Sequence, residues 1–280
     1  MTEAFVPRSV PPLPAATVML VRDGALGLEV FVLRRSMSAV FAGGMYVFPG
    51  GKVDPADATP EVNAVCDGLD DDAASAALGI DRGGLAFWVG AIRECFEEAG
   101  VLLATSADGS VVRFDDPAAA ERFEGHRHAV HDGALDLVTL CRDERLRLSV
   151  GPIRYVSHWI TPVGEGRRFD TRFFLARAPQ AQEPLHDDGE TIESLWIRPA
   201  EALERNHHGE LAMMPPTVAN LRFLADHATA DGVMAAAAAL PTPPRILPKA
   251  VFDRAGRFVE LLLPGDTGFD EAEEYVVHDD

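Results

Sequence analysis

The segment AIRECFEEAGVLL, residues 91–103, places Glu94, Glu97 and Glu98 in an otherwise apolar stretch. At about 100° per residue of an α-helix, these three carboxylates fall on one narrow arc. The opposite arc is apolar and consists of Trp88, Val89, Ile92, Cys95, Phe96 and Ala99. The pattern predicts an amphipathic helix over about 86–99, which Gly100 is well placed to end.

The acidic arc has two interpretations. A solvated helix face usually mixes charges of both signs. Here the only nearby cation is Arg93, which can pair with Glu97 one turn later, so Glu94 and Glu98 have no cationic partner on the helix. Hard divalent cations such as Mg²⁺ favour clustered carboxylate oxygens. A plain solvated face and a cation site on the solvent side of the helix both stay open from the local sequence.

Composition excludes some classes of function. The 280 residues include 25 basic and 44 acidic side chains, for a net charge of −19, which argues against a general nucleic-acid or anionic-membrane binder. An anionic small molecule is still allowed, because a bound metal inverts the local field. The sequence has no long apolar run and no signal-peptide pattern, and its three cysteines are widely spaced. We therefore expect a cytoplasmic protein with reduced cysteines.

The rest of the chain predicts one large domain with additions at both ends. Residues 1–15 are proline-rich and are expected to form a flexible arm, residues 16–210 the main domain, and residues 211–280 an extension packed on that domain. Strand pairs are predicted at 16–22 with 28–34 and at 154–162 with 171–179, and helices near 117–130, 134–145 and 215–228. A strand, a proline and a helix follow each other in 194–203, and a last hairpin lies within 245–266. This mixture favours a mixed sheet with helices on its faces.

A second motif precedes the acidic helix. FPGGKVDPADA, residues 48–58, ends a short apolar strand in a glycine turn, and Arg93-Glu94-x-x-Glu97-Glu98-x-Gly100 follows later. Together they resemble the Nudix hydrolase signature, which is a glycine, five residues, a glutamate, seven residues and then REUxEExGU with U apolar. Gly51 matches the leading glycine. Asp57 stands where the family has its first glutamate, and 35 residues separate Asp57 from Arg93.

This interrupted signature resembles the peroxisomal coenzyme A diphosphatase-like branch of the Nudix family. Further matching stretches are HWITP (158–162), RRFDTRFF (167–174) and LLPGD (262–266). The resemblance implies an α/β fold, namely a Nudix-type α/β/α sandwich with a mixed sheet. It also implies an insertion at 58–85 inside the signature and a C-terminal helix and hairpin extension.

The resemblance assigns roles to the residues of the signature. It implies Mg²⁺ or Mn²⁺ held by Glu94 and Glu98, with Glu97 completing the cluster and the Gly51 carbonyl as a further ligand. Residues expected to support the site are Arg93, Asp57, Gly50 and Gly100. The general base is not fixed by the signature. Glu190, in a loop before a predicted strand, is one candidate, and Glu97 is the other.

The predicted reaction is hydrolysis of a nucleoside diphosphate linked to another moiety, with coenzyme A or acyl-coenzyme A as the preferred substrate. Val40 stands where the branch often has an arginine, so an NADH or ADP-ribose diphosphatase stays an alternative, as does a non-catalytic Nudix-fold binding or regulatory module. Expected partners are a small-molecule nucleotide and a second copy of the chain, with no nucleic acid and no membrane. Candidate substrate-binding residues are Arg34, Arg35, Tyr46, Phe48, Arg167 and Arg172.

Overall fold

The computed structural model describes residues 5–37, 42–187 and 189–277. A mixed sheet forms its centre, with strand order β10-β2-β1-β9-β8-β11. Its strands are β1 (Leu13–Gly24), β2 (Gly27–Arg35), β8 (Arg154–Ile160), β9 (Phe169–Arg177), β10 (Thr191–Ile197) and β11 (Arg245–Ile246). Two short strands, β3 (Tyr46–Val47) and β4 (Gly50–Lys52), pair with β2 and β1. The β1–β9 and β11–β8 pairs are parallel and the other pairs are antiparallel, so the predicted mixed sheet is confirmed.

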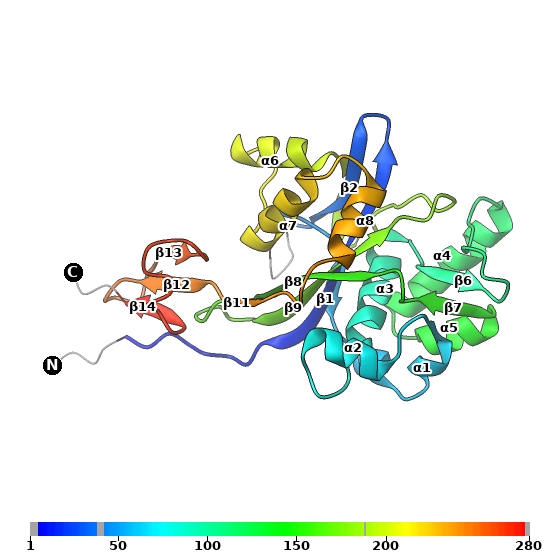
Figure 1. The fold of residues 1–280 in the computed structure, drawn as a ribbon, viewed down its shortest axis with the longest axis horizontal. Helices are drawn as coiled ribbons and strands as arrows, with labels where there is room; N and C mark the ends of the chain where they lie inside the picture. The colour runs from blue at the N-terminus through cyan, green and yellow to red at the C-terminus, as the bar shows by residue number, and fades with distance from the viewer. Residues whose placement is uncertain (1–4, 38–41, 188, 278–280) are drawn as a thin grey trace.

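Helices cover both faces of this sheet (Figure 1). On one face lie α3 (Leu85–Ala99), α4 (Pro117–His131) and α5 (Leu137–Asp143), and on the other α6 (Pro199–His207), α7 (Pro215–Ala225) and α8 (Ala230–Ala238). Both faces of strand β1 are apolar, so each face must be covered. Val18 and Leu20 belong to the core under α3, and the alternating Met19 and Val21 belong to the core under α7 and α8. The α/β/α sandwich is confirmed.

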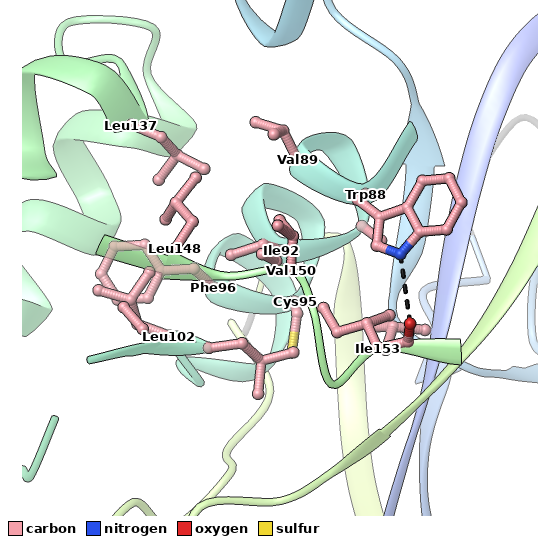
Figure 2. Close-up of a cluster of buried hydrophobic side chains, with 14 of the residues drawn as sticks. Trp88, Val89, Ile92, Cys95, Phe96, Leu102, Leu137, Leu148, Val150 and Ile153 are labelled. Atoms are coloured by element: carbon pink, nitrogen blue, oxygen red, sulfur yellow. Dashed lines mark hydrogen bonds between the residues drawn. The ribbon is translucent and has the colours of Figure 1, made fainter. Parts of the chain in front are cut away.

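Helix α3 is anchored by its apolar arc, as the sequence pattern predicts (Figure 2). Ile92, Cys95 and Phe96 are buried, and the Trp88 indole nitrogen donates to the Ile153 carbonyl at 3.3 Å. The helix ends where predicted, because Gly100 adopts a left-handed conformation with φ = +67°.

The insertion at 58–85 folds into structure and packs against α3. A 3₁₀ turn (Pro55–Ala58) leads into it, and it contains α1 (Val62–Val65), β5 (Cys66–Asp67) and α2 (Asp71–Leu78). Strand β5 forms a small sheet with β7 (Leu146–Ser149) and β6 (Ala104–Ser106). The Asp71 carboxylate accepts hydrogen bonds from the Gly83 and Leu85 amides at 2.9 and 3.0 Å. The insertion therefore satisfies amide groups at the start of the acidic helix.

The C-terminal residues divide into two parts. Leu211, α7 and α8 belong to the core of the main sheet, so the boundary expected at residue 211 falls inside that core. A separate three-stranded sheet follows, made of β12 (Lys249–Phe252), β13 (Phe258–Leu262) and β14 (Tyr275–Val277), at the left of Figure 1. Strands β12 and β13 form the predicted hairpin.

Of the predicted N-terminal arm, residues 5–12 lie beside this C-terminal sheet, and residues 13–15 already belong to β1. The rings of Phe5 and Phe252 are 5.3 Å apart, and the Arg168 guanidinium donates to the Val10 carbonyl at 2.9 Å. These residues of the arm are thus extended and contact the domain. Within the described residues, no helix is long and apolar enough to cross a membrane.

Candidate active site

The acidic turn of α3 lies directly beside the glycines of β4. The Gly50 amide donates to Glu98 Oε2 at 2.8 Å, and Glu98 is only 5% exposed. A Cβ atom at Gly51 would lie 2.5 Å from Glu94 Oε1, so a side chain there would displace the carboxylate. The expectation that Glu98 lies on the solvent side of the helix is therefore wrong, because Glu98 fills the gap between α3 and β4.

Arg93 organises the carboxylates around it. Its Nε donates to Asp57 Oδ1 at 3.0 Å, and its Nη2 donates to Asp57 Oδ2 at 3.1 Å. Its Nη1 lies 3.0 Å from both Glu94 Oε1 and Glu97 Oε1. The predicted pair with Glu97 is present, but Glu94 also has a cationic partner on the helix, contrary to expectation. Asp57, although 36 residues away in sequence, is buried against Arg93 and fixes it.

Burial perturbs both glutamates that face β4. Loss of water raises the pKa of Glu94 to about 7, against the opposing influence of Arg93. Burial also raises the pKa of Glu98 well above its usual value, and repulsion from Glu94 adds to that effect. The negative charges of these two carboxylates are therefore not fully compensated by nearby cationic side chains. A bound cation would stabilise their ionised forms.

The side chains of the acidic turn form only part of the expected cation site. In the part of the chain that the structure describes, no three His, Cys, Asp or Glu side chains are grouped so that they could hold a metal ion. The expected three-glutamate cluster is therefore not preformed, because Arg93 Nη1 lies between Glu94 and Glu97. Glu94 and Glu98 still fit a Mg²⁺-like ion, since such ions commonly use one or two carboxylates together with water and substrate phosphates.

Across from α3, Arg35 connects the acidic turn to Glu190. Arg35 Nη1 lies 3.6 Å from Glu98 Oε1, and its Nη2 lies 3.5 Å from Glu190 Oε2. The Glu190 side chain is 56% exposed, so it also faces water. Asp187 shapes the loop by accepting hydrogen bonds from the amides of Glu190 and Thr191 at 3.1 and 2.9 Å. Tertiary structure thus places the predicted loop carboxylate near Glu98.

A cavity of about 1450 Å³ opens over this turn. One wall contains the charged side chains Arg93, Glu94, Glu97 and Glu98, together with the backbone of 50–52. Another wall, from the sheet and the C-terminal strands, is apolar and consists of Trp159, Ile160, Phe173, Phe252, Phe258 and Leu261. Of the predicted substrate-binding residues, Arg35, Phe48 and Arg167 line the cavity.

The other three predicted substrate-binding residues are not among the residues that line the cavity, so their assignment stays a prediction. The Tyr46 hydroxyl donates to Glu193 Oε2 at 3.0 Å, and Arg34 pairs with the same oxygen at 3.4 Å. Arg172 pairs with Asp170 and covers the Phe87 ring at 4.6 Å. Strand alternation explains this, because the neighbours of Arg172, Thr171 and Phe173, face the cavity instead. Val40 lies outside the described residues.

Sequence reasoning missed Arg127. This residue of α4 is 4% exposed and donates to the backbone carbonyls of Glu97 and Glu98 at 2.9 and 3.1 Å. No local pattern marks it, because its partners are about thirty residues away in sequence and the contact depends on how α4 packs against α3.

Comparisons with known proteins settle the family. The family model of the NUDT19 Nudix domain matches residues 70–224, which is more than half of the chain. The chain is also 31% identical over 291 residues to the acyl-coenzyme A diphosphatase NUDT19 of Gallus gallus, covering 90% of this chain and 75% of that protein. This chain belongs to the Nudix hydrolase family.

Two further similarities agree with this assignment. The acyl-coenzyme A diphosphatase NUDT19 of Homo sapiens is 28% identical over 286 residues, covering 90% of this Nudix chain and 75% of that protein. A crystal structure of a Nudix hydrolase from Alicyclobacillus acidocaldarius matches with a TM-score of 0.68 and 30% identity, covering 85% of this chain and 100% of that chain.

Family membership also fits the geometry of the acidic turn. Nudix hydrolases generally use divalent metal ions. The match to the NUDT19 Nudix domain begins at residue 70, so Gly51 and Asp57 precede it. Both residues nevertheless contact α3 in the folded chain, Asp57 through its ion pair with Arg93 and Gly51 through its close approach to Glu94.

Proposed function

We propose that this Nudix hydrolase cleaves the diphosphate bridge of coenzyme A and its acyl esters with Mg²⁺ or Mn²⁺. The products would be adenosine 3′,5′-bisphosphate and a phosphopantetheine, acylated when the substrate is an ester. The relatives from chicken and human carry the name acyl-coenzyme A diphosphatase and align over most of this chain. The observation that carries the proposal is that the acidic turn and an extended apolar wall line the same cavity.

The apolar wall favours an acylated substrate over the alternatives. Phe258 is 62% exposed although it lines the cavity, so the wall keeps apolar surface open to solvent. NADH and ADP-ribose are polar at both ends and would leave this surface uncovered. An acyl chain on the pantetheine arm would bury it, at about 0.8 kcal/mol for each CH₂ group removed from water.

The charged residues that line the cavity have distinct tasks in this reaction. A divalent ion at Glu94 and Glu98 would neutralise phosphate charge and lower the pKa of attacking water. Arg35 and Arg167 line the cavity and can bind phosphate oxygens, and the Arg35 guanidinium can do so bidentately. Asp57 holds Arg93, which in turn holds Glu97 and Glu94 in place.

We assign the general base to Glu190. When water attacks one phosphorus of the bridge, the P–O–P bond breaks and the water proton passes to a carboxylate. Glu190 is exposed and bound loosely by Arg35, at 3.5 Å, whereas Glu97 is engaged by Arg93 at 3.0 Å. A carboxylate that faces water and is released when Arg35 binds phosphate is better placed to accept this proton.

Product analysis tests the proposal. The purified chain with Mg²⁺ or Mn²⁺ is offered coenzyme A, acetyl-coenzyme A, a long-chain acyl-coenzyme A, NADH and ADP-ribose in parallel, with Glu98→Gln as the blank. We expect the highest kcat/KM for the coenzyme A compounds. A preference for NADH or ADP-ribose would contradict the proposed substrate but leave the proposed active site unchanged. Metal binding without cleavage of any compound would favour a binding module.

Two further predictions concern the protein as a whole. We propose a homodimer, which sedimentation velocity measures directly, and a monomer at all accessible concentrations would contradict it.

We also propose that the protein acts in the cytoplasm, which cell fractionation followed by immunodetection tests.

A further inference from the structure

The C-terminal end of α3 has every carbonyl of its last turn satisfied. A helix leaves its last four carbonyls without partners inside the helix. The Phe96 carbonyl accepts from the Gly100 amide at 3.0 Å, and the Ala99 carbonyl accepts from the Leu185 amide at 3.0 Å. The remaining two carbonyls, of Glu97 and Glu98, accept from Arg127 Nε and Nη2 at 2.9 and 3.1 Å.

Arg127 also binds the segment that leads to Glu190. The same Nη2 atom donates to the Leu185 carbonyl at 3.0 Å. From Leu185 the chain continues to the Asp187 turn, whose hydrogen bonds orient the amides of Glu190 and Thr191. One guanidinium therefore joins the backbone of Glu98 to the start of the loop that carries Glu190, whereas Arg35 contacts the carboxylate of the same Glu98.

The position of Arg127 is specific for an arginine. The residue is 4% exposed, and its ion pair is with Glu124 at 3.6 Å, a side chain that is itself half exposed. Its charge is therefore stabilised chiefly by helix-end carbonyls, which carry partial negative charge. Three carbonyls in fixed directions require a planar fork of N–H donors, and a lysine ammonium cannot reproduce it.

Gly100 belongs to the same arrangement. A Cβ atom at Gly100 would lie 3.1 Å from Arg127 Nη1, and the residue has φ = +67°. The glycine of the Nudix motif thus ends the helix and also leaves room for the guanidinium.

We propose that Arg127 is a positioning residue of this enzyme, which fixes the turn bearing Glu97 and Glu98 relative to the loop bearing Glu190. The inference rests on the proposed function, because it presumes that Glu98 binds the metal and Glu190 accepts the proton. Arg127 does not touch substrate and acts only through these backbone groups. A small shift of either carboxylate would slow the reaction without removing any reacting group.

The test compares Arg127→Lys and Arg127→Ala with Arg122→Ala in the full chain. Arg122 lies on the same helix, is exposed and pairs with Glu144, so it is a matched control. We expect the Arg127 variants to lose about 10- to 100-fold in kcat with little change in KM. Guanidinium, at concentrations well below those that unfold the protein, should restore part of the activity of Arg127→Ala and none in Arg127→Lys.

A second readout does not depend on turnover. Mn²⁺ binding, followed by electron paramagnetic resonance, should weaken about tenfold in Arg127→Lys and stay unchanged in Arg122→Ala. Circular dichroism and melting temperature report whether each variant is folded. If the wild type binds Mn²⁺ but cleaves no coenzyme A compound, the proposed function fails while the difference in Mn²⁺ affinity still supports the inference. Folded Arg127 variants with wild-type kcat and Mn²⁺ affinity would overturn it and leave Arg127 as a stability residue.

Discussion

The two walls of the cavity differ in how their side chains are held. On the charged wall, Glu98 is fixed by the Gly50 amide, and Arg93 is fixed by Asp57, each with specific hydrogen bonds between buried groups. On the apolar wall, Phe258 and Leu261 come from a small sheet beyond the main core, and Phe258 is largely exposed. The charged wall is held by directional hydrogen bonds, whereas the outer part of the apolar wall, at Phe258, leaves apolar surface exposed.

We expect this difference to separate catalysis from specificity. Phosphate chemistry requires charges at fixed positions, so small changes on the charged wall should have large effects. An apolar wall contributes in proportion to the area it buries, so changes there should be small and depend on the substrate.

The largest effect is expected for Glu98→Gln. The amide oxygen can still accept the Gly50 hydrogen bond, but the metal loses an anionic ligand, so kcat/KM should fall by more than about 100-fold. Steady-state kinetics with Mg²⁺ measures this, and the melting temperature without metal should be maintained or raised. A variant with wild-type activity would contradict the metal assignment, and one that melts far below the wild type without metal would show that Glu98 is structural.

A somewhat smaller loss is expected for Asp57→Asn. This change removes the charge that holds Arg93, so Glu94 and Glu97 lose their orientation and activity should fall about 10- to 100-fold. Asp116→Asn is the control, because Asp116 caps α4 through the Ala119 amide away from the cavity. Equal activity of the two variants would show that Asp57 does not support the site.

The pH dependence of stability should show that the buried carboxylates of the acidic turn lack a compensating positive charge. The pKa of Glu94 is about 7 in the folded protein and 4.5 ordinarily, so the folded state binds its proton more tightly. In the presence of a chelator, the resulting stabilisation is complete below about pH 4.5 and is lost as the pH rises through about 7. The melting temperature of the metal-free protein should therefore fall over this interval.

Metal should reverse this trend. Added Mg²⁺ or Mn²⁺ should raise the melting temperature near pH 8 and have little effect near pH 5, where the carboxylates of Glu94 and Glu98 hold protons. Calorimetric scans across this range measure both behaviours. A melting temperature that does not change with pH in chelator, or a metal effect that is equal at both ends, would contradict the assignment.

The smallest effect is expected on the apolar wall. Phe258→Ala should lower kcat/KM for a long-chain acyl-coenzyme A by about 1 kcal/mol, or roughly fivefold, and leave coenzyme A itself unchanged. Val259→Ala is the matched control, since Val259 is 51% exposed on the same strand but is absent from the cavity lining. Equal losses of kcat/KM for both substrates in Phe258→Ala would show that the acyl chain does not bind at this wall.

Much of the fold was predictable because local patterns dominate it. The apolar arc of α3, the strand pairs β1–β2 and β8–β9, and the strand, proline and helix at β10–α6 follow from side-chain periodicity and backbone constraints. Strands β6 and β7 were not predicted, because they are short and are stabilised by pairing with each other and with the insertion.

The site was only partly predictable for a related reason. Spacing placed Glu94, Glu97 and Glu98 on one turn, but it could not show that Glu98 is buried against Gly50 or that Glu94 shares Arg93. The substrate-binding predictions separated into Arg35, Phe48 and Arg167 inside the cavity and Arg34, Tyr46 and Arg172 outside it. That division depends on which strand face each residue occupies in the assembled sheet.

The sequence by itself determined the family, the acidic helix and the glycine turn, because these depend on residue type and on spacings of a few positions. Only the tertiary structure decided which carboxylates face the cavity and which arginines reach them, with Arg127 on the Glu98 backbone and Arg35 between the Glu98 and Glu190 carboxylates. The physical reason is that burial and charge pairing act through space. In this protein the residues that contact each other at the site are about 30 to 160 positions apart in the sequence. No local sequence pattern shows that they come together.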